Sequence, residues 1–456
     1  MNNHTVKQEL KQLAALALPI FIAQISFTAM GFVDTVMAAR FSDTDLAAIG
    51  IGSSISIPIM LFAQALLFSV TAKAAPFWGA GQYKSAGQIF YQGLVLAFFA
   101  GIALGLLLYA ISTQLHWFNI DRALQPIAGG YQFYLALTMP VIALYQAARS
   151  FIETTGQTRP VMFINLSGLL INIPLNAIFI YGLLGAPRLG GIGCGVATLM
   201  SFTFMLFLQC VFIYNNHHCQ QALKGHSFSD AIAMRPLLSL LGLGLPIAMT
   251  MLLEVSLFTV ITLLIAPFGI AAIASHQIAL SLSSQIFMVP YSQATALTIH
   301  IGHLIGEARQ GIISKARVIF AIKIGLATAL VISLCTSSLI ILFNYELSSL
   351  YTKTPELMAL AAALVIISAA YQIPDAIQVC CNGVLRAFHI VKKPLAMSLV
   401  AYWLIALPIG YLLAFYGINH LEPLETKGFW VALVIGLSLN ALFLSFLLWQ
   451  TIRRYR

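Results

Sequence analysis

Three carboxylic acids, Asp34, Glu254 and Asp375, stand inside long apolar runs of the sequence. A charge at the centre of a bilayer costs about 2.5–3.5 kcal/mol on insertion scales, so such residues usually face a cavity or a partner and serve ion or proton pathways. No Lys or Arg stands deep in any of the apolar runs to neutralise them. A polar contact that only joins helices is the alternative for each acid. Three such acids in one chain favour ion chemistry.

The composition of the chain indicates that the protein is embedded in lipid. The chain has 456 residues, of which 60% are hydrophobic and 8% are charged, too few to cover a soluble protein of this size. Twelve apolar runs are long enough to cross a hydrocarbon core about 30 Å thick. They cover approximately residues 12–39, 46–72, 88–112, 127–148, 161–182, 191–214, 236–266, 271–299, 318–344, 358–385, 395–416 and 428–451. The sequence therefore predicts an all-α integral membrane protein.

The distribution of positive charge predicts the orientation. With the amino terminus in the cytoplasm, eighteen of the twenty-three Lys and Arg residues fall on the inner side of the twelve spans. This excess satisfies the positive-inside rule with both termini cytoplasmic. The net charge of +9 then reflects topology and attraction to anionic lipid, and we expect no nucleic-acid partner.

The chain repeats itself after six spans. Leu18-Pro19-Ile20 recurs as Leu245-Pro246-Ile247, and the Ala-Ala-Ile at 47–49 recurs at 271–273. Because six is even, both halves enter the membrane from the same side and form a parallel repeat. We expect an amino-terminal lobe over residues 1–214, a cytoplasmic linker over 215–235 and a carboxy-terminal lobe over 236–456. Two such bundles around a central cavity are typical of alternating-access transporters.

The three acids in the apolar runs are divided between the two predicted halves. Asp34 belongs to the first half, whereas Glu254 and Asp375 belong to the second and stand at similar depth, so the latter two are expected to share one site. Tyr371 precedes Asp375 by four residues and therefore lies on the same helical face. Pro374 frees a backbone carbonyl that can coordinate Na⁺. Ordinary packing is the alternative for Tyr371.

Several longer motifs resemble the multidrug and toxic compound extrusion (MATE) transporters, and within them the bacterial NorM branch. The resemblance covers nearly the whole chain. It rests on LALPI with GFVDTVMA, LGGIGCGVAT, LLEVSLF, ASHQIAL, AYQIPDAIQ, and RSFIETTGQTRP with its counterpart LRAFHIVKKP. Each motif alone is weak, but their order across twelve spans is specific.

The resemblance implies a V-shaped pair of six-helix bundles that exports organic cations in exchange for Na⁺ or H⁺, without a cofactor. Glu254, Tyr371 and Asp375 match the cation site of the carboxy-terminal lobe, where Na⁺ is one candidate ion. Asp34 matches the coupling acid of the amino-terminal lobe. The expected polar neighbours of Asp34 are Asn172, Asn176 and Thr198. Some relatives carry an acid where this chain has Asn176, which weakens the case for a tight Na⁺ site there.

Aromatic and Met side chains are the candidates for a loose lining that tolerates many flat cations. They are Phe258, Phe287, Met288 and Tyr291, for each of which packing against lipid is the alternative. His276 lies inside a span and is either a proton relay or a hydrogen-bonded interior residue. We expect a protein of the bacterial inner membrane that acts as a monomer.

Two other classes of protein compete with cation export. A lipid-linked sugar flippase of the same superfamily would need cationic side chains in its cavity to hold pyrophosphate. An intramembrane prenyltransferase would need paired acids for Mg²⁺ and diphosphate, and the one close pair, Asp43 and Asp45, falls in a predicted outer loop.

Overall fold

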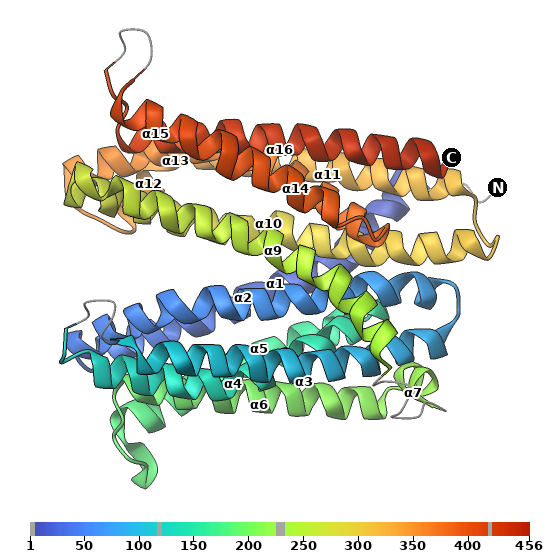
Figure 1. Cartoon of the computed structure of the whole chain (residues 1–456), viewed down its shortest axis with the longest axis horizontal. Coiled ribbons are helices and arrows are strands. Elements are labelled where there is room, and N and C mark those ends of the chain that lie inside the picture. The colour runs from blue at the N-terminus through green and yellow to red at the C-terminus, as the bar shows by residue number, and fades with distance from the viewer. Residues whose placement is uncertain (1–4, 116–120, 225–232, 418–421) are drawn as a thin grey trace. The chain divides into compact units, whose positions relative to one another are not determined.

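The computed structural model describes residues 5–115, 121–224, 233–417 and 422–456, and these residues are almost entirely helical. Twelve helices in this part of the chain are long and apolar enough to cross a membrane, which confirms the predicted all-α class and the number of spans. Most begin before and end beyond the apolar runs, because helices continue past the hydrocarbon boundary into the interface. Figure 1 shows the helices of each unit lying alongside one another.

The helices follow the predicted order along the chain, with labels as in Figure 1. The first half contains α1 (Val6–Ala39), α2 (Asp43–Gly79), α3 (Tyr83–Thr113), α4 (Gln125–Thr154), α5 (Thr158–Tyr181), the 3₁₀ turn η2 (Leu183–Gly185), α6 (Gly191–Asn215) and the short α7 (His217–Leu223). The second half contains α9 (Met234–Ile265), η3 (Ala266–Phe268), α10 (Ile270–Arg309), α11 (Lys315–Leu342), α12 (Asn344–Ser349), α13 (Pro355–Ala387), α14 (Lys392–Leu399), η4 (Val400–Ala406), α15 (Leu407–Phe415) and α16 (Thr426–Tyr455).

The eleventh span is not a regular α-helix. Its middle, η4, has π-helical hydrogen bonding between α14 and α15. One residue is inserted per π turn, which rotates the following side chains about the helix axis. Tyr402 and Trp403 lie in this segment, and both take part in the polar contacts described below.

The chain forms two compact units whose boundaries fall inside helices. The amino-terminal unit is Leu18–Ala248, and the carboxy-terminal unit contains the residues up to Ala17 together with Met249–Arg456. The first turns of α1 thus pack with the second half, where Leu13 enters a core built from α10, α11, α13 and α16. Conversely, the first turns of α9 pack with the first half, where Leu240 joins a core with Val70 and Ile89.

Close backbone approach holds the start of α9 in the amino-terminal unit. A Cβ added to Gly244 would lie 2.3 Å from the carbonyl oxygen of Leu66 on α2, whereas a Cβ at Gly242 would meet no atom within 4 Å. The ammonium group of Lys73 donates to the Ser239 hydroxyl at 3.1 Å across the same pair of helices.

The Gly244→Ala substitution is expected to destabilise the amino-terminal unit, because the new methyl group must push α9 away from α2. Overpacking of this kind costs about 1–3 kcal/mol. Thermal unfolding of the purified protein in detergent should therefore show a lower midpoint. Gly242→Ala is the matched control, since it changes helix propensity equally and meets open space. Equal midpoints for the two variants would contradict the proposed close packing.

Candidate ion-coupling sites

Asp34 lies near the end of α1 in a polar cluster within the amino-terminal unit. The Asn176 amide donates to Asp34 Oδ1 at 2.6 Å, and the Thr198 hydroxyl donates to Asp34 Oδ2 at 3.1 Å. The same Asn176 amide donates to Asn172 Oδ1 at 2.9 Å, which is allowed because the two residues stand one turn apart on α5. All four side chains are buried. The structure brings Asp34 together with each of its three predicted neighbours.

The Asp34 cluster leaves some of its polar atoms unused. The Asn172 Nδ2 and Asn176 Oδ1 atoms are buried and have no hydrogen-bond partner within the described residues. The Cys194 thiol, which the motif LGGIGCGVAT contains but the sequence did not single out, approaches the Asp34 backbone oxygen at 3.6 Å. Buried groups without partners are costly unless something occupies them in part of the working cycle.

Asp375 lies on α13 in a second polar cluster, within the carboxy-terminal unit. The Gln378 amide donates to Asp375 Oδ1 at 3.1 Å, and the Asn440 amide on α16 donates to Gln378 Oε1 at 2.7 Å. Asn440 also donates to the Tyr402 hydroxyl at 3.0 Å and to the Ser398 hydroxyl at 3.2 Å. The sequence did not identify Gln378, Asn440 or Tyr402, although Gln378 was within reach as the next turn after Asp375.

Glu254 and Tyr371 belong to the neighbourhood of Asp375. The negative charge of Asp375 and the positive charge of Arg386 both act on Glu254, and the charges of both acids act on the Tyr371 hydroxyl. On α9, the Trp403 indole donates to the backbone oxygen of Leu253, the residue before Glu254, at 3.2 Å. The π-helical segment therefore supports both acids: Tyr402 through Asn440 and Gln378, and Trp403 through Leu253.

A small cavity lies one helical turn from Asp375. It is lined by Val289, Pro290, Gln293, Ala329, Ile332, Ser333, Thr336, Gln372 and Ala376, and leaves ≈ 10 Å³ for the centre of a water molecule. The buried Gln372 Nε2 atom has no protein partner in the described structure. A polar cavity that admits one water and offers an unpaired donor is expected to hold that water.

His276 has a tautomer that its neighbours determine. The Trp430 indole N–H donates to His276 Nδ1 at 3.1 Å, and an indole nitrogen can only donate. His276 Nε2 therefore carries the hydrogen and donates to the Thr262 hydroxyl at 2.9 Å, while that hydroxyl donates to the Phe258 carbonyl. The Trp430 ring stacks on Tyr371 with centroids 5.9 Å apart. This geometry favours an interior positioning role over a proton relay.

The four aromatic and Met candidates for the substrate lining are half-buried. Phe287 and Tyr291 contact each other with ring centroids 5.9 Å apart, and Met288 is the residue between Phe287 and the cavity-lining Val289. Phe258 packs against a different core, which also contains Tyr371 and Trp430. The structure thus places Phe258 apart from the Phe287–Tyr291 contact, and a role in binding substrate stays a prediction for all four.

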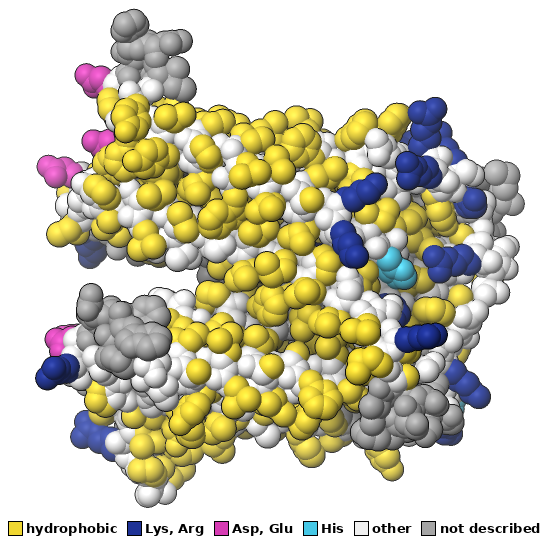
Figure 2. Space-filling view, in the orientation of Figure 1, with side chains coloured by type: hydrophobic (Ala, Val, Ile, Leu, Met, Phe, Trp, Pro, Cys, Tyr) yellow, Lys and Arg dark blue, Asp and Glu magenta, His cyan; other side chains and the backbone are white. Residues whose placement is uncertain are grey.

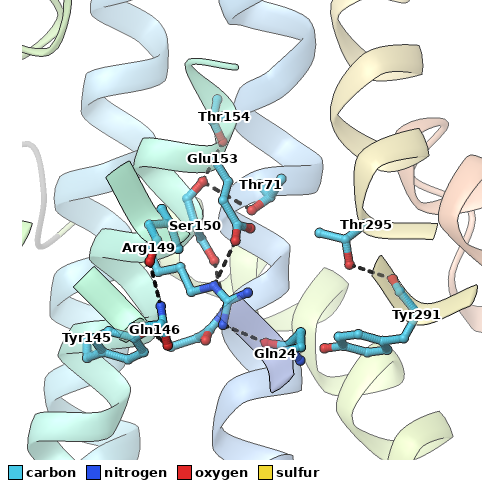
Figure 3. A network of polar contacts seen from close by, with 12 residues as sticks. Gln24, Thr71, Tyr145, Gln146, Arg149, Ser150, Glu153, Thr154, Tyr291 and Thr295 are labelled. Carbon is cyan, nitrogen blue, oxygen red and sulfur yellow. Dashed lines mark hydrogen bonds and ion pairs between the residues drawn. The ribbon is translucent and has the colours of Figure 1, made fainter. Parts of the chain in front are cut away.

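Three further acids are buried that the sequence placed in loops or at span ends. Glu153 on α4 forms an ion pair with Arg149 at 2.7 Å, and Arg149 also donates to Gln24 on α1 at 2.8 Å. Figure 3 shows the guanidinium group between these two partners. Both charged side chains are almost fully buried, so the placement of Arg149 and Glu153 beyond the end of the fourth span was wrong. It failed because the expected span ended at residue 148, whereas α4 continues to Thr154.

The other two unexpected acids also have partners that compensate their charge. Glu9 accepts from His300 at 2.6 Å and is ion-paired with Arg317, which ties the start of α1 to α10 and α11. Asp45 is not in a loop: it lies in the first turn of α2 and accepts the Gly191 backbone N–H at 2.6 Å, at the amino-terminal end of α6. An anion at that position is stabilised by the helix dipole.

Five of the six acids, all except Glu254, fall into two groups by their contacts. Glu9 and Glu153 pair with cations, and Asp45 pairs with a helix terminus. Asp34 and Asp375 are contacted only by neutral amide and hydroxyl donors within the described residues. The carboxyl groups of the second group are therefore held in place without a cationic side chain bonded to them.

The family model MatE matches residues 19–178 and again residues 246–412 of this chain. The chain belongs to the MatE family. The two matches begin at Pro19 and Pro246, the same register as the repeat read from the sequence. The repeat is therefore a property of the family model as well as of this chain.

Curated relatives match over nearly full length. The multidrug resistance protein NorM of Photobacterium profundum is 37% identical and covers 97% of this chain and 95% of its own length. The multidrug resistance protein MdtK of Yersinia enterocolitica is 39% identical, with coverages of 96% and 94%. These matches confirm the resemblance to the NorM branch.

Solved structures share the MatE fold. A crystal structure of the eukaryotic MATE transporter AtDTX14 has a TM-score of 0.87 at 19% identity and covers 99% of both chains. The Vibrio cholerae MATE transporter VcmN in its bent form has a TM-score of 0.84 at 19% identity, with coverages of 99% and 98%. At these identities the similarity concerns the fold alone.

The Glu153→Ala substitution is expected to lower the thermal midpoint strongly, because Arg149 stays buried without its negatively charged partner. Removing one partner of a buried ion pair costs about 3–5 kcal/mol. Glu153→Gln keeps an acceptor and should cost less. Glu346→Ala, at an exposed acid on α12, is the control and should leave the midpoint unchanged. A Glu153→Ala protein as stable as the wild type would show that the pair contributes nothing.

The substitution His276→Gln is expected to keep most of the stability and transport, whereas His276→Ala should lose both. Glutamine can accept from Trp430 and donate to Thr262 as the histidine does, whereas alanine leaves the indole N–H unpaired at about 1–3 kcal/mol. Glutamine cannot carry a proton through the membrane. If the His276→Gln protein is stable but shows no pH-driven transport, the result would contradict the positioning role and support a proton relay at His276.

Proposed function

We propose that this protein is a secondary active multidrug efflux transporter that exports organic cations by antiport with Na⁺ or H⁺. The observation that carries the proposal is that Asp34 and Asp375 are buried and bonded only by neutral donors, one in each half of a repeated membrane fold. Relatives that match over almost the entire chain are named multidrug resistance proteins, which supports the drug substrate. The chain is not an enzyme, and it is a multi-pass membrane protein.

In the proposed mechanism Asp34 alternates between two partners. When a proton or Na⁺ occupies the carboxylate, the Asn176 and Thr198 donors keep the side chain in place. When the ion leaves, the exposed negative charge attracts a cationic drug. Because one charge serves both ligands, binding of the coupling ion displaces the drug, and this competition produces antiport. Asn172 and Asn176 supply the oxygen atoms that a hard cation prefers.

The proposed second ion site consists of Glu254, Tyr371 and Asp375. Two carboxylates that act on each other cannot both stay ionised in a low-dielectric site without a cation or a proton. Na⁺ at this position would be held by these oxygen ligands, and Pro374 leaves a backbone carbonyl nearby. The supporting side chains Gln378 and Asn440 keep Asp375 oriented and carry no charge themselves.

The proposed topology follows from the charges and the repeat. Both termini lie in the cytoplasm, residues 215–235 form a cytoplasmic linker, and residues 1–214 and 236–456 form the two lobes of an alternating-access transporter that works as a monomer. Figure 2 supports this orientation, since Lys and Arg side chains gather at the end of the carboxy-terminal unit where the chain terminates, and Asp and Glu at the opposite end. The lining by Phe258, Phe287, Met288 and Tyr291 would accept flat aromatic cations.

The flippase alternative is disfavoured by the charges at the two sites. Arg149 is a buried cation of the kind that could bind pyrophosphate, but it is already paired with Glu153 and Gln24. The prenyltransferase alternative required Asp43 and Asp45 as a pair of metal-binding acids. It is disfavoured because Asp45 accepts a backbone hydrogen bond at the amino-terminal end of α6.

Ethidium efflux from proteoliposomes under an imposed Na⁺ gradient or pH gradient tests the proposed function. We expect one of the two gradients to drive efflux, and Asp34→Asn and Asp375→Asn to abolish it, because an amide cannot exchange a proton or compensate a cation. Asp43→Asn, at an exposed acid of the same type, is the matched control and should transport normally. Normal transport by both site variants would make the buried acids structural.

A further inference from the structure

A groove on α11 lies outside both ion sites. It has a volume of ≈ 500 Å³ and is lined by Lys315, Ala316, Ile319, Phe320, Lys323 and the carboxy-terminal Arg456. The lining residues of α11 follow one another at alternating intervals of one and three positions, so they form one continuous face of the helix. All belong to the carboxy-terminal unit.

The side chains that line the groove include three cations and no acid, so the groove keeps a net positive charge when the α-carboxylate of Arg456 is counted. The Lys315 ammonium lies 5.5 Å from the centre of the Tyr455 ring, which is a weak contact for a charge at an exposed site. Lys323 and Arg456 are exposed. Within the described structure, neither side chain has a hydrogen bond or an ion pair. An anion is therefore the ligand that the groove would attract.

One wall of the groove is anchored by aromatic contacts. Tyr455 packs its ring edge-on against Phe388, just after α13, with centroids 5.2 Å apart, and the Lys315 ammonium lies over the same ring. The end of α16, and with it Arg456, therefore lies next to the start of α11. Ile319 is buried at the base of the groove, and Phe320 is half-buried beside it.

The depth of Lys323 indicates where the anion comes from. With 28 residues, α11 is ~42 Å long, which exceeds the ~30 Å hydrocarbon core by about eight residues. Lys323 stands eight residues after Lys315, or ~12 Å further along the helix. A lysine at that depth reaches back to the interface by its flexible stem, where lipid phosphates lie.

We propose that this groove binds the headgroup of an anionic membrane phospholipid. Lys315, Lys323 and Arg456 surround the phosphate and its neighbouring headgroup oxygens, and the acyl chain runs over Phe320 and Ile319. Basic pockets at the membrane surface recognise acidic headgroups by the same combination of charge and apolar contact. The site is independent of the antiport mechanism, so either can fail without the other.

Native mass spectrometry of the purified full-length protein with added phosphatidylglycerol tests this site. We expect a bound phosphatidylglycerol that phosphatidylcholine does not replace. The triple substitution Lys315→Gln, Lys323→Gln and Arg456→Gln should weaken binding at least about tenfold, given the contribution of each basic residue near a membrane surface. Phe320→Gln, which leaves the charges intact, should also weaken it.

The matched control removes the same charge elsewhere. Lys392, Lys393 and Arg454 are exposed cations that do not line the groove, and their triple substitution by Gln should leave phosphatidylglycerol binding unchanged. Equal losses in the two triple variants would overturn the proposal, because binding would then follow net charge alone. Displacement of the lipid by millimolar inorganic phosphate, with no effect of Phe320→Gln, would assign the groove to a soluble anion. If the triple variant does not fold, Lys323→Gln alone decides between these outcomes.

Discussion

A carboxylate inside a bilayer has no water to solvate it, so the rest of the chain must supply every partner. This structure meets that constraint in two ways. Glu9 and Glu153 are matched by cations that are buried or partly buried with them, and the helices they join are fixed. Within the described residues Asp34 and Asp375 receive only neutral donors, so their carboxyl groups are positioned without a bonded counter-charge. Fold and ion coupling therefore depend on the same rule, applied with and without a counter-charge.

The repeat distributes this chemistry over the two halves without copying it. The amino-terminal unit has one acid held by asparagine and threonine side chains, whereas the carboxy-terminal unit has two acids supported through Gln378, Asn440 and the π-helical segment. The first arrangement resembles a site for one exchangeable charge. The second resembles a site in which two like charges require a cation or a proton between them. Homologous scaffolds thus hold different numbers of buried acids.

The part of this fold that could be predicted from the sequence is the part that short-range patterns encode. Hydropathy revealed the twelve spans, because each span is a continuous run of about 20 or more residues. The repeat was revealed because the short motifs at Pro19 and Pro246 are nearly identical. The neighbours of Asp34 were found because family motifs name them. By contrast, Arg149 and Glu153 were misplaced because hydropathy drops at a buried ion pair exactly as it does at a helix end. Asn440 and Trp430 were missed because their partners lie 62 and 154 positions away in the chain.

The exchange of helix ends between the two units has a consequence for producing the two halves of the chain as separate polypeptides. Leu13 fills a core of the second half, and Leu240 fills a core of the first. Each half therefore carries a segment that completes the other, as in a domain-swapped dimer. Halves produced as separate polypeptides would each expose an unfilled helical groove, and only co-expression would fill both.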